Sequence, residues 1–117
     1  MESENNPGTN PDQPDLSAAL DRLWTRFLPE IRERVAKIES ATQSLSHGEL
    51  DTEQREAAAS AAHKLAGVLG TFSLQRGTDL ARELELAFSG ADAAHPDAAP
   101  RLAAKTAELR TVIESRK

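Results

Sequence analysis

Apolar residues recur along this chain at intervals of three and four positions, the spacing that gathers side chains on one face of an α-helix. Five segments show this pattern, and we expect helices over about 16–27, 29–46, 51–72, 74–90 and 97–115. The connections between the later segments are short, which favours antiparallel neighbours in a bundle. The pattern therefore predicts an all-α fold, an antiparallel four-helix bundle with an additional short N-terminal helix.

The positions predicted to face the core are those on the apolar stripe of each helix. In the short first helix they are Leu16, Leu20, Leu23 and Phe27. Trp24 and Phe27 are expected to be the core anchors of this helix, with contact to a partner protein as the alternative. In the bundle they are Ile31, Val35, Ile38, Thr42, Leu45, Ala58, Ala61, Ala62, Leu65, Val68, Leu69, Phe72, Leu74, Gly77, Leu80, Ala81, Leu84, Phe88, Leu102, Thr106, Leu109 and Ile113. Many of these side chains are small, which is typical of closely packed helices.

Four helix boundaries carry local signals. Asp15 stands where the first helix needs an N-cap. Pro29 fits best as the first residue of a new helix, where its missing N–H is no loss, although a bend there is the alternative. Gly48 suits the left-handed position that follows a helix end. Asp51 and Gln54 resemble a capping box at the start of the third helix.

Composition divides the chain into a tail and one domain. The first 15 residues hold three of the six prolines among polar residues, so we expect residues 1–15 to be a disordered tail and 16–117 to be the bundle domain. The initial Met and this lead-in favour a free-standing chain, and we expect a monomer. The chain has three Phe, one Trp and no Tyr, which fits helices better than strands.

Charge and residue usage exclude several classes of function. A net charge of −5 argues against binding the phosphate backbone of a nucleic acid. The absence of Cys removes disulfides and thiolate metal sites, and the three His residues lack metal-ligand spacing, so we expect no bound metal. No apolar run approaches the roughly 18 residues of a membrane span, and the polar N-terminus is not signal-like. We therefore expect a cytoplasmic protein.

One histidine lies on an unusual surface of the third helix. Helical residues advance by about 100° each, which places His63 on the solvent face, opposite the core residue Leu65. The neighbours of His63 on this face are small: Ala59, Ser60, Gly67 and Gly70. Each Gly weakens a helix by roughly 1 kcal/mol relative to Ala, so a compensating function is expected. Bare backbone lets another protein approach the imidazole closely, and we predict a docking face here.

Glu85 is the expected partner of this imidazole. In an antiparallel pair of helices, residues 63 and 85 are each 11 positions from residue 74 at the turn, and so lie at the same height. The carboxylate would accept a hydrogen bond from one ring nitrogen and leave the other free, which is the arrangement of an imidazole nucleophile. The alternative for Glu85 is a solvated surface carboxylate. His47 and His95 are read only as helix-end residues.

The segments AHKLAG and LARELE resemble the histidine phosphotransfer (HPt) domain of two-component phosphorelays. The motif of that family is a His, a Leu two positions later, a Gly four positions later and a further Gly three after that. Leu65, Gly67 and Gly70 match these offsets from His63, and the resemblance spans roughly residues 30–115. It implies a four-helix bundle with an added N-terminal helix. It also implies His63 as the phospho-acceptor and Glu85 as the residue that orients it.

Two positions depart from the family pattern. The family commonly has a Lys three residues after the His, where it helps to hold the phosphoryl group, and this chain has Ala66. Lys64 lies about 100° from His63 and is the candidate substitute, with a solvated Lys as the alternative. A Gly frequent at the end of the motif is Ser73 here.

The resemblance implies a phosphoryl carrier that relays a phosphoryl group between receiver-domain aspartates through phosphohistidine at His63. The chain has no Gly-rich nucleotide loop and no carboxylate cluster, so we expect no kinase activity of its own and no cofactor, with Mg²⁺ supplied by the receiver. The expected partners are response-regulator receivers and a hybrid histidine kinase. Ala66 favours an alternative, a binding module that docks such partners without carrying phosphate. A hydrolase using His63 as general base lacks a second catalytic group beyond Glu85 and an obvious pocket.

Overall fold

The protein is built from four long helices. The computed structural model describes residues 12–90, 93 and 95–116. The helices are α2 (Asp12–Ser46), α3 (Thr52–Thr71), α4 (Gln75–Ser89) and α5 (Ala99–Ser115), and a short 3-10 helix, η3 (Pro96–Ala98), precedes α5. The described part of the chain contains no strand, so the predicted all-α class is confirmed. None of the helices in this part is long and apolar enough to cross a membrane.

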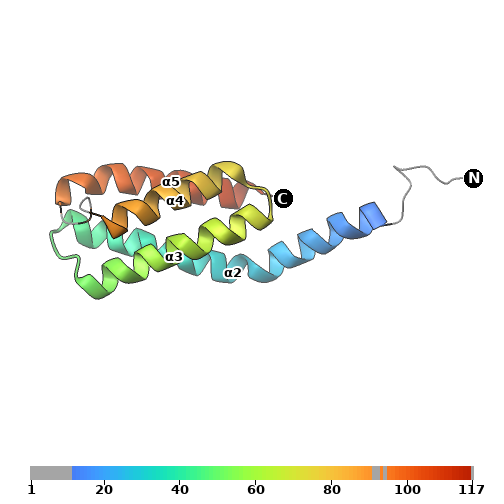
Figure 1. Ribbon diagram of the computed structural model, residues 1–117, viewed down its shortest axis with the longest axis horizontal. Helices are drawn as coiled ribbons and strands as arrows, with labels where there is room; N and C mark the ends of the chain where they lie inside the picture. Colours follow the sequence, from blue (N-terminus) through green and yellow to red (C-terminus); the bar gives the residue numbers. More distant parts are fainter. Residues whose placement is uncertain (1–11, 91–92, 94, 117) are drawn as a thin grey trace, which may run out of the picture.

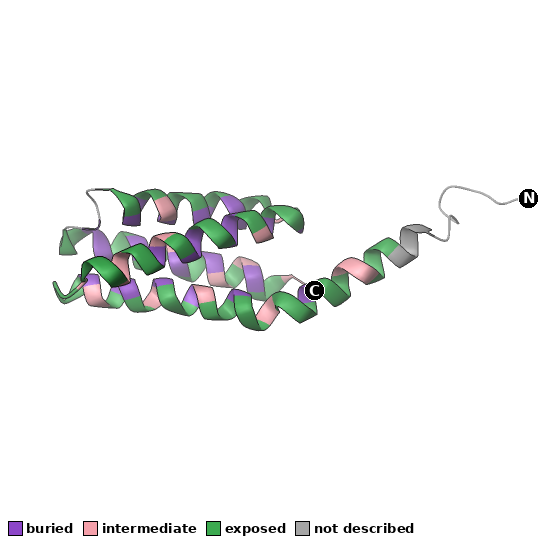
Figure 2. Cartoon of the chain, turned by 60° about the horizontal axis from the view of Figure 1, so that its bottom comes forward, coloured by how far each residue is buried: buried purple, intermediate pink, exposed green. Residues whose placement is uncertain are grey.

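The helices form a closed ring around one core. α3 packs against α4, α4 against α5, and both α3 and α5 against α2 (Figure 1). Buried positions lie on the sides of the helices that face one another (Figure 2). Every inward position predicted between Ile31 and Ile113 is buried, except Val68 and Leu74, which are half-buried. The helical periodicity of the sequence therefore located the core of the bundle correctly.

The prediction of a separate first helix is wrong, because α2 continues through Pro29. A proline inside a helix removes the hydrogen bond to the carbonyl four residues before it, here that of Thr25. Both residues are exposed, so water can solvate this carbonyl. Trp24 and Ile31, on either side of the proline, are buried against the bundle. This packing stabilises the helix on both sides of the proline and outweighs the local cost, although α2 changes direction where it leaves the bundle (Figure 1).

The start of α2 also differs from the prediction. The helix begins at Asp12, so the expected N-cap Asp15 lies inside it and residues 12–15 of the expected tail are helical. Residues 1–11 of that tail lie outside the described part of the chain. The beginning of α2 extends past the bundle, with no other helix beside it (Figure 1). Leu16 is consequently 62% exposed. Leu23 and Phe27 lie beside the buried Trp24 but are 38% and 40% exposed, so the expectations that Leu23 faces the core and that Phe27 anchors it are wrong.

Trp24 is the anchor that the structure confirms. It is buried and packs edge-to-face on Phe72, with 5.1 Å between the ring centroids. The guanidinium of Arg116 lies over both rings, 5.0 Å from the centre of Trp24 and 5.3 Å from that of Phe72. These residues come from α2, the end of α5 and the turn after α3. Trp24 therefore closes one end of the bundle.

The helix ends follow the predicted signals in most cases. The carboxylate of Asp51 accepts a hydrogen bond of 2.7 Å from the backbone N–H of Gln54, which caps α3. The side chain of Gln54 donates to the Ser40 hydroxyl at 3.3 Å, so the return bond of a capping box is replaced by a contact with α2. Gly48 has the expected positive φ, +70°.

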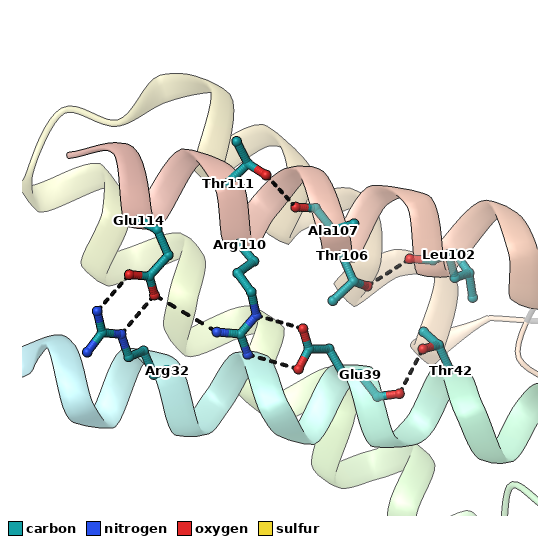
Figure 3. Close-up of polar contacts among 9 residues, drawn as sticks. All are labelled: Arg32, Glu39, Thr42, Leu102, Thr106, Ala107, Arg110, Thr111 and Glu114. Carbon is teal, nitrogen blue, oxygen red and sulfur yellow. Dashed lines mark hydrogen bonds and ion pairs between the residues drawn. The ribbon is translucent and has the colours of Figure 1, made fainter.

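A network of ion pairs that the sequence analysis did not predict joins α2 to α5 (Figure 3). Arg110 donates two hydrogen bonds to the carboxylate of Glu39, at 2.7 and 2.8 Å. Arg32 donates two to Glu114, at 2.8 and 2.6 Å. The hydrogen bonds from Arg32, together with the charges of Arg32 and Arg110, hold the pKa of Glu114 below its ordinary value. The network fixes α2 beside α5 on the outside of the core.

Candidate functional site

His63 lies on the outer face of α3, with its side chain 73% exposed to solvent. The core side of this helix is occupied by Ala61, Ala62, Leu65 and Leu69. Because His63 precedes Leu65 by two positions, the helical period turns its ring away from the core. The predicted exposure of His63 is confirmed.

The imidazole is held by a carboxylate from the neighbouring helix. Nδ1 of His63 lies 2.9 Å from Oε2 of Glu85, whose side chain is 31% exposed on α4. An ionised carboxylate can only accept a hydrogen bond, so Nδ1 carries the proton that is donated. In the ring that carries this proton alone, Nε2 has a free lone pair. The predicted register of α3 and α4 is confirmed by this contact.

The surface beside the ring is hollowed. A shallow depression of about 210 Å³ is lined by His63, Ala66, Gly67, Arg82 and Glu85. Its lining residues come from α3 and α4, and include the imidazole and its carboxylate partner. The depression gives a small group bonded to the ring a place to lie against the protein.

The two glycines of α3 are not required by the packing of the bundle. A Cβ built on Gly67 would meet no atom within 4 Å. One built on Gly70 would lie 3.8 Å from the hydroxyl of Thr78, which is ordinary van der Waals contact. On Gly77 of α4, by contrast, a Cβ would lie 3.0 Å from a methyl of Leu69, so that glycine serves close packing of the helices. The bare surface at Gly67 and Gly70 has no such internal explanation.

The predicted docking face lies along the same side of α3. Ser60, Gly67 and Gly70 are exposed, and Ala59 is half-buried. Lys64 is exposed and is not among the residues that line the hollow. Ala66 is buried and forms part of the wall of the hollow.

Arg82 is a site residue that the sequence analysis missed. It is exposed on α4, one helical turn before Glu85, and lines the hollow. The register that located Glu85 could have found it, because residues 66 and 82 are each eight positions from residue 74. His47 and His95 are exposed at helix ends, at the end of α2 and before η3. Within the described ranges, no group of His, Asp and Glu side chains is arranged to hold a metal ion.

The pattern of an exposed His, small neighbours and a four-helix bundle agrees with the comparison to known proteins. The family model of the Hpt domain matches residues 22–115. The chain belongs to the Hpt domain family. Protein RcaC of Microchaete diplosiphon is 30% identical over 102 residues, which is 87% of this chain and 16% of that protein. The chain thus spans about a sixth of the curated relative it matches, and no solved structure matches it significantly.

Membership of this family gives the class of activity. An Hpt domain is a phosphotransfer module of two-component phosphorelays. Domains of this family interact with receiver domains and kinases. The family match covers the whole of α3 and α4, and therefore includes His63, Glu85 and the hollow between them.

Proposed function

We propose that this Hpt domain carries a phosphoryl group on Nε2 of His63 and exchanges it with the phosphorylated aspartate of receiver domains. One observation carries the proposal: an imidazole that is largely exposed and donates its Nδ1 proton to Glu85 at 2.9 Å. This contact selects the tautomer whose bare nitrogen is available for attack. The exposure allows a second protein to bring its phosphoryl group in line with that nitrogen.

The proposed step is a transfer between two proteins. The lone pair of Nε2 attacks phosphorus, and the bond from phosphorus to the aspartate oxygen breaks with its electron pair left on the carboxylate. The ring then carries a positive charge, which the carboxylate of Glu85 stabilises while it accepts the Nδ1–H hydrogen bond. The reverse step passes the group to another receiver. The receiver supplies Mg²⁺ and its charge neutralisation, and this chain is a carrier without kinase activity of its own.

The receiver is proposed to dock on the face formed by Ala59, Ser60, Gly67 and Gly70. Side chains there extend little above the helix backbone, so the partner's active site can reach the imidazole. The open space above Gly67 supports this assignment, because no neighbour within the bundle uses it. Transient docking of this kind suits a carrier that must release each partner after transfer.

Labelling experiments test the proposal. A receiver carrying radiolabelled aspartyl phosphate should transfer label to this protein, and the product should be acid-labile and base-stable, as phosphohistidine is. His63→Gln should abolish labelling without loss of helical circular dichroism. His47→Gln and His95→Gln are matched controls and should label like the unchanged protein. Label on the His63→Gln variant would refute the assignment.

A second candidate function is a docking module that binds receivers or kinases but carries no phosphate. Ala66 favours it, because the wall of the hollow on α3 has no positive charge to hold a phosphoryl group. In that case the receiver would bind with the same dependence on the docking face, and its phosphate would stay on aspartate. Measuring binding and transfer in the same sample separates the two functions.

A further inference from the structure

A phosphoryl group on His63 creates an electrostatic problem at this site. It adds a charge of about −1.5 to −2 at neutral pH. The carboxylate of Glu85, 2.9 Å from Nδ1, pairs with the positive charge of the phosphorylated ring. The negative oxygens of the phosphoryl group are left uncompensated, so a positive charge near Nε2 would stabilise the phosphorylated domain.

Arg82 is the one cationic residue that lines the hollow beside the imidazole. The antiparallel register fixed by His63 and Glu85 places it opposite Ala66, nearer the α3–α4 turn. It precedes Glu85 by three residues, and side chains at this spacing lie on the same face of a helix. Arg82 thus projects from α4 at the level where α3 offers only a methyl group.

The guanidinium of Arg82 is also free to bind a ligand. Elsewhere on the surface, Arg32, Arg76 and Arg110 each form two hydrogen bonds to a carboxylate. Among the residues the structure describes, Arg82 forms no hydrogen bond or ion pair. A planar guanidinium can donate two parallel hydrogen bonds to phosphoryl oxygens, which suits it to this role better than a point charge.

We propose that Arg82 binds the phosphoryl group carried by His63, supplying from α4 the positive charge that Ala66 does not supply from α3. This inference rests on the proposed function of His63 and names a second residue that contacts the transferred group. It also removes the need for Lys64, which lies outside the hollow. Arg82 stabilises the phosphorylated state and makes its formation faster, while the bonds made and broken are those of the transfer already described.

The experiment measures labelling of the protein by phosphoramidate, a small donor that needs no docking face, and by a phosphorylated receiver. Arg82→Ala should slow labelling by both donors about tenfold or more, because it removes a charge-assisted contact. Arg82→Lys should keep part of the rate. Lys64→Ala is the matched control and should label like the unchanged protein. Since Arg82 is exposed, its variants should melt at the same temperature.

A compensating variant and a spectroscopic readout sharpen the test. Adding Ala66→Lys to Arg82→Ala should restore the rate of labelling, because both positions line the same hollow. Circular dichroism verifies that the double variant is folded. Phosphorus NMR of the phosphorylated protein should show a higher phosphate pKa in Arg82→Ala than in the unchanged protein. A merely structural residue would not shift that titration.

Three results would overturn the inference. If Arg82→Ala is labelled by both donors at the unchanged rate, Arg82 has no role and the function of His63 stands. If only transfer from the receiver is slowed, Arg82 is a docking contact and does not bind the phosphoryl group. If the unchanged protein is labelled by neither donor, the proposed function itself fails, and this inference fails with it.

Discussion

Ser73 adopts a backbone conformation that favours glycine, with a φ of +60°. Its N–H donates to the carbonyl of Gly70 at 3.1 Å, and the N–H of Leu74 donates to that of Leu69 at 3.0 Å. These two bonds form a Schellman motif, which ends a helix with one left-handed residue. This turn sets the register of α3 and α4 and hence the contact between His63 and Glu85.

Replacing Ser73 with glycine should stabilise the protein. A residue with a Cβ pays about 1–2 kcal/mol in the left-handed region, and glycine loses part of that gain through its greater freedom when unfolded. We therefore expect Ser73→Gly to raise the free energy of unfolding by about 0.5–1 kcal/mol, measured by urea denaturation. Ser73→Ala keeps the Cβ and should bring no such gain. A lower stability of Ser73→Gly would contradict this account of the turn.

Gly67 should separate stability from function. Replacing it with Ala adds a Cβ that meets nothing, so the gain in helix propensity is expected in full, about 1 kcal/mol. Gly67→Gln should also stabilise the helix, and its longer side chain should slow transfer from the receiver while labelling by phosphoramidate continues. Urea denaturation and the two labelling assays measure these effects. Unchanged transfer from the receiver in Gly67→Gln would show that the docking face lies elsewhere.

The residues of the site differ in how far the sequence reveals them. His63 and Glu85 could be paired because the helical period and the position of the turn fix their direction and height. The same register places Arg82 opposite Ala66, but it does not show that Arg82 belongs to the site. What sets it apart is a hollow between two helices and the lack of a carboxylate partner, and both depend on the packed structure.

At the scale of helices, the least predictable feature is how α2 is held. The rule that a proline starts a helix is local, whereas the continuity of α2 through Pro29 depends on contacts with the bundle on both sides of it. The ion pairs from α2 to α5 are equally hidden, since Arg110 and Glu39 are 71 positions apart in the sequence. Helix periodicity predicts which face is buried, and it contains no information about which surface charges meet.

The pairing of Glu114 with two arginines gives α2 and α5 a pH-dependent contact. Because the folded pKa of Glu114 lies below its ordinary value of 4.5, the pair stabilises the fold above that value and loses its effect as pH falls through the folded pKa. Glu114→Gln should therefore slightly lower the urea midpoint at neutral pH. At a pH below the folded pKa of Glu114 the variant and the unchanged protein should agree.

Glu33, an exposed carboxylate on α2, offers the control for this experiment. Glu33→Gln removes a negative charge without breaking an ion pair described in the structure, so its midpoint should follow that of the unchanged protein at both pH values. If the urea midpoint of Glu114→Gln stays below that of the unchanged protein in acid as well, the cause is lost packing and not lost charge.

For the molecule as a whole, the folding unit begins inside α2 and not at its first residue. Leu16 and Ser17 are exposed where the helix extends past the bundle, whereas Trp24 is buried at the end of the bundle against Phe72. Removal of residues 1–18 should therefore leave the free energy of unfolding and the labelling of His63 nearly unchanged. Trp24→Ala should lower that free energy by about 3–5 kcal/mol, as expected for loss of a buried aromatic side chain. Urea denaturation followed by circular dichroism compares the free energies of unfolding of the two variants. If the chain lacking residues 1–18 is as unstable as Trp24→Ala, the start of α2 contributes to the core.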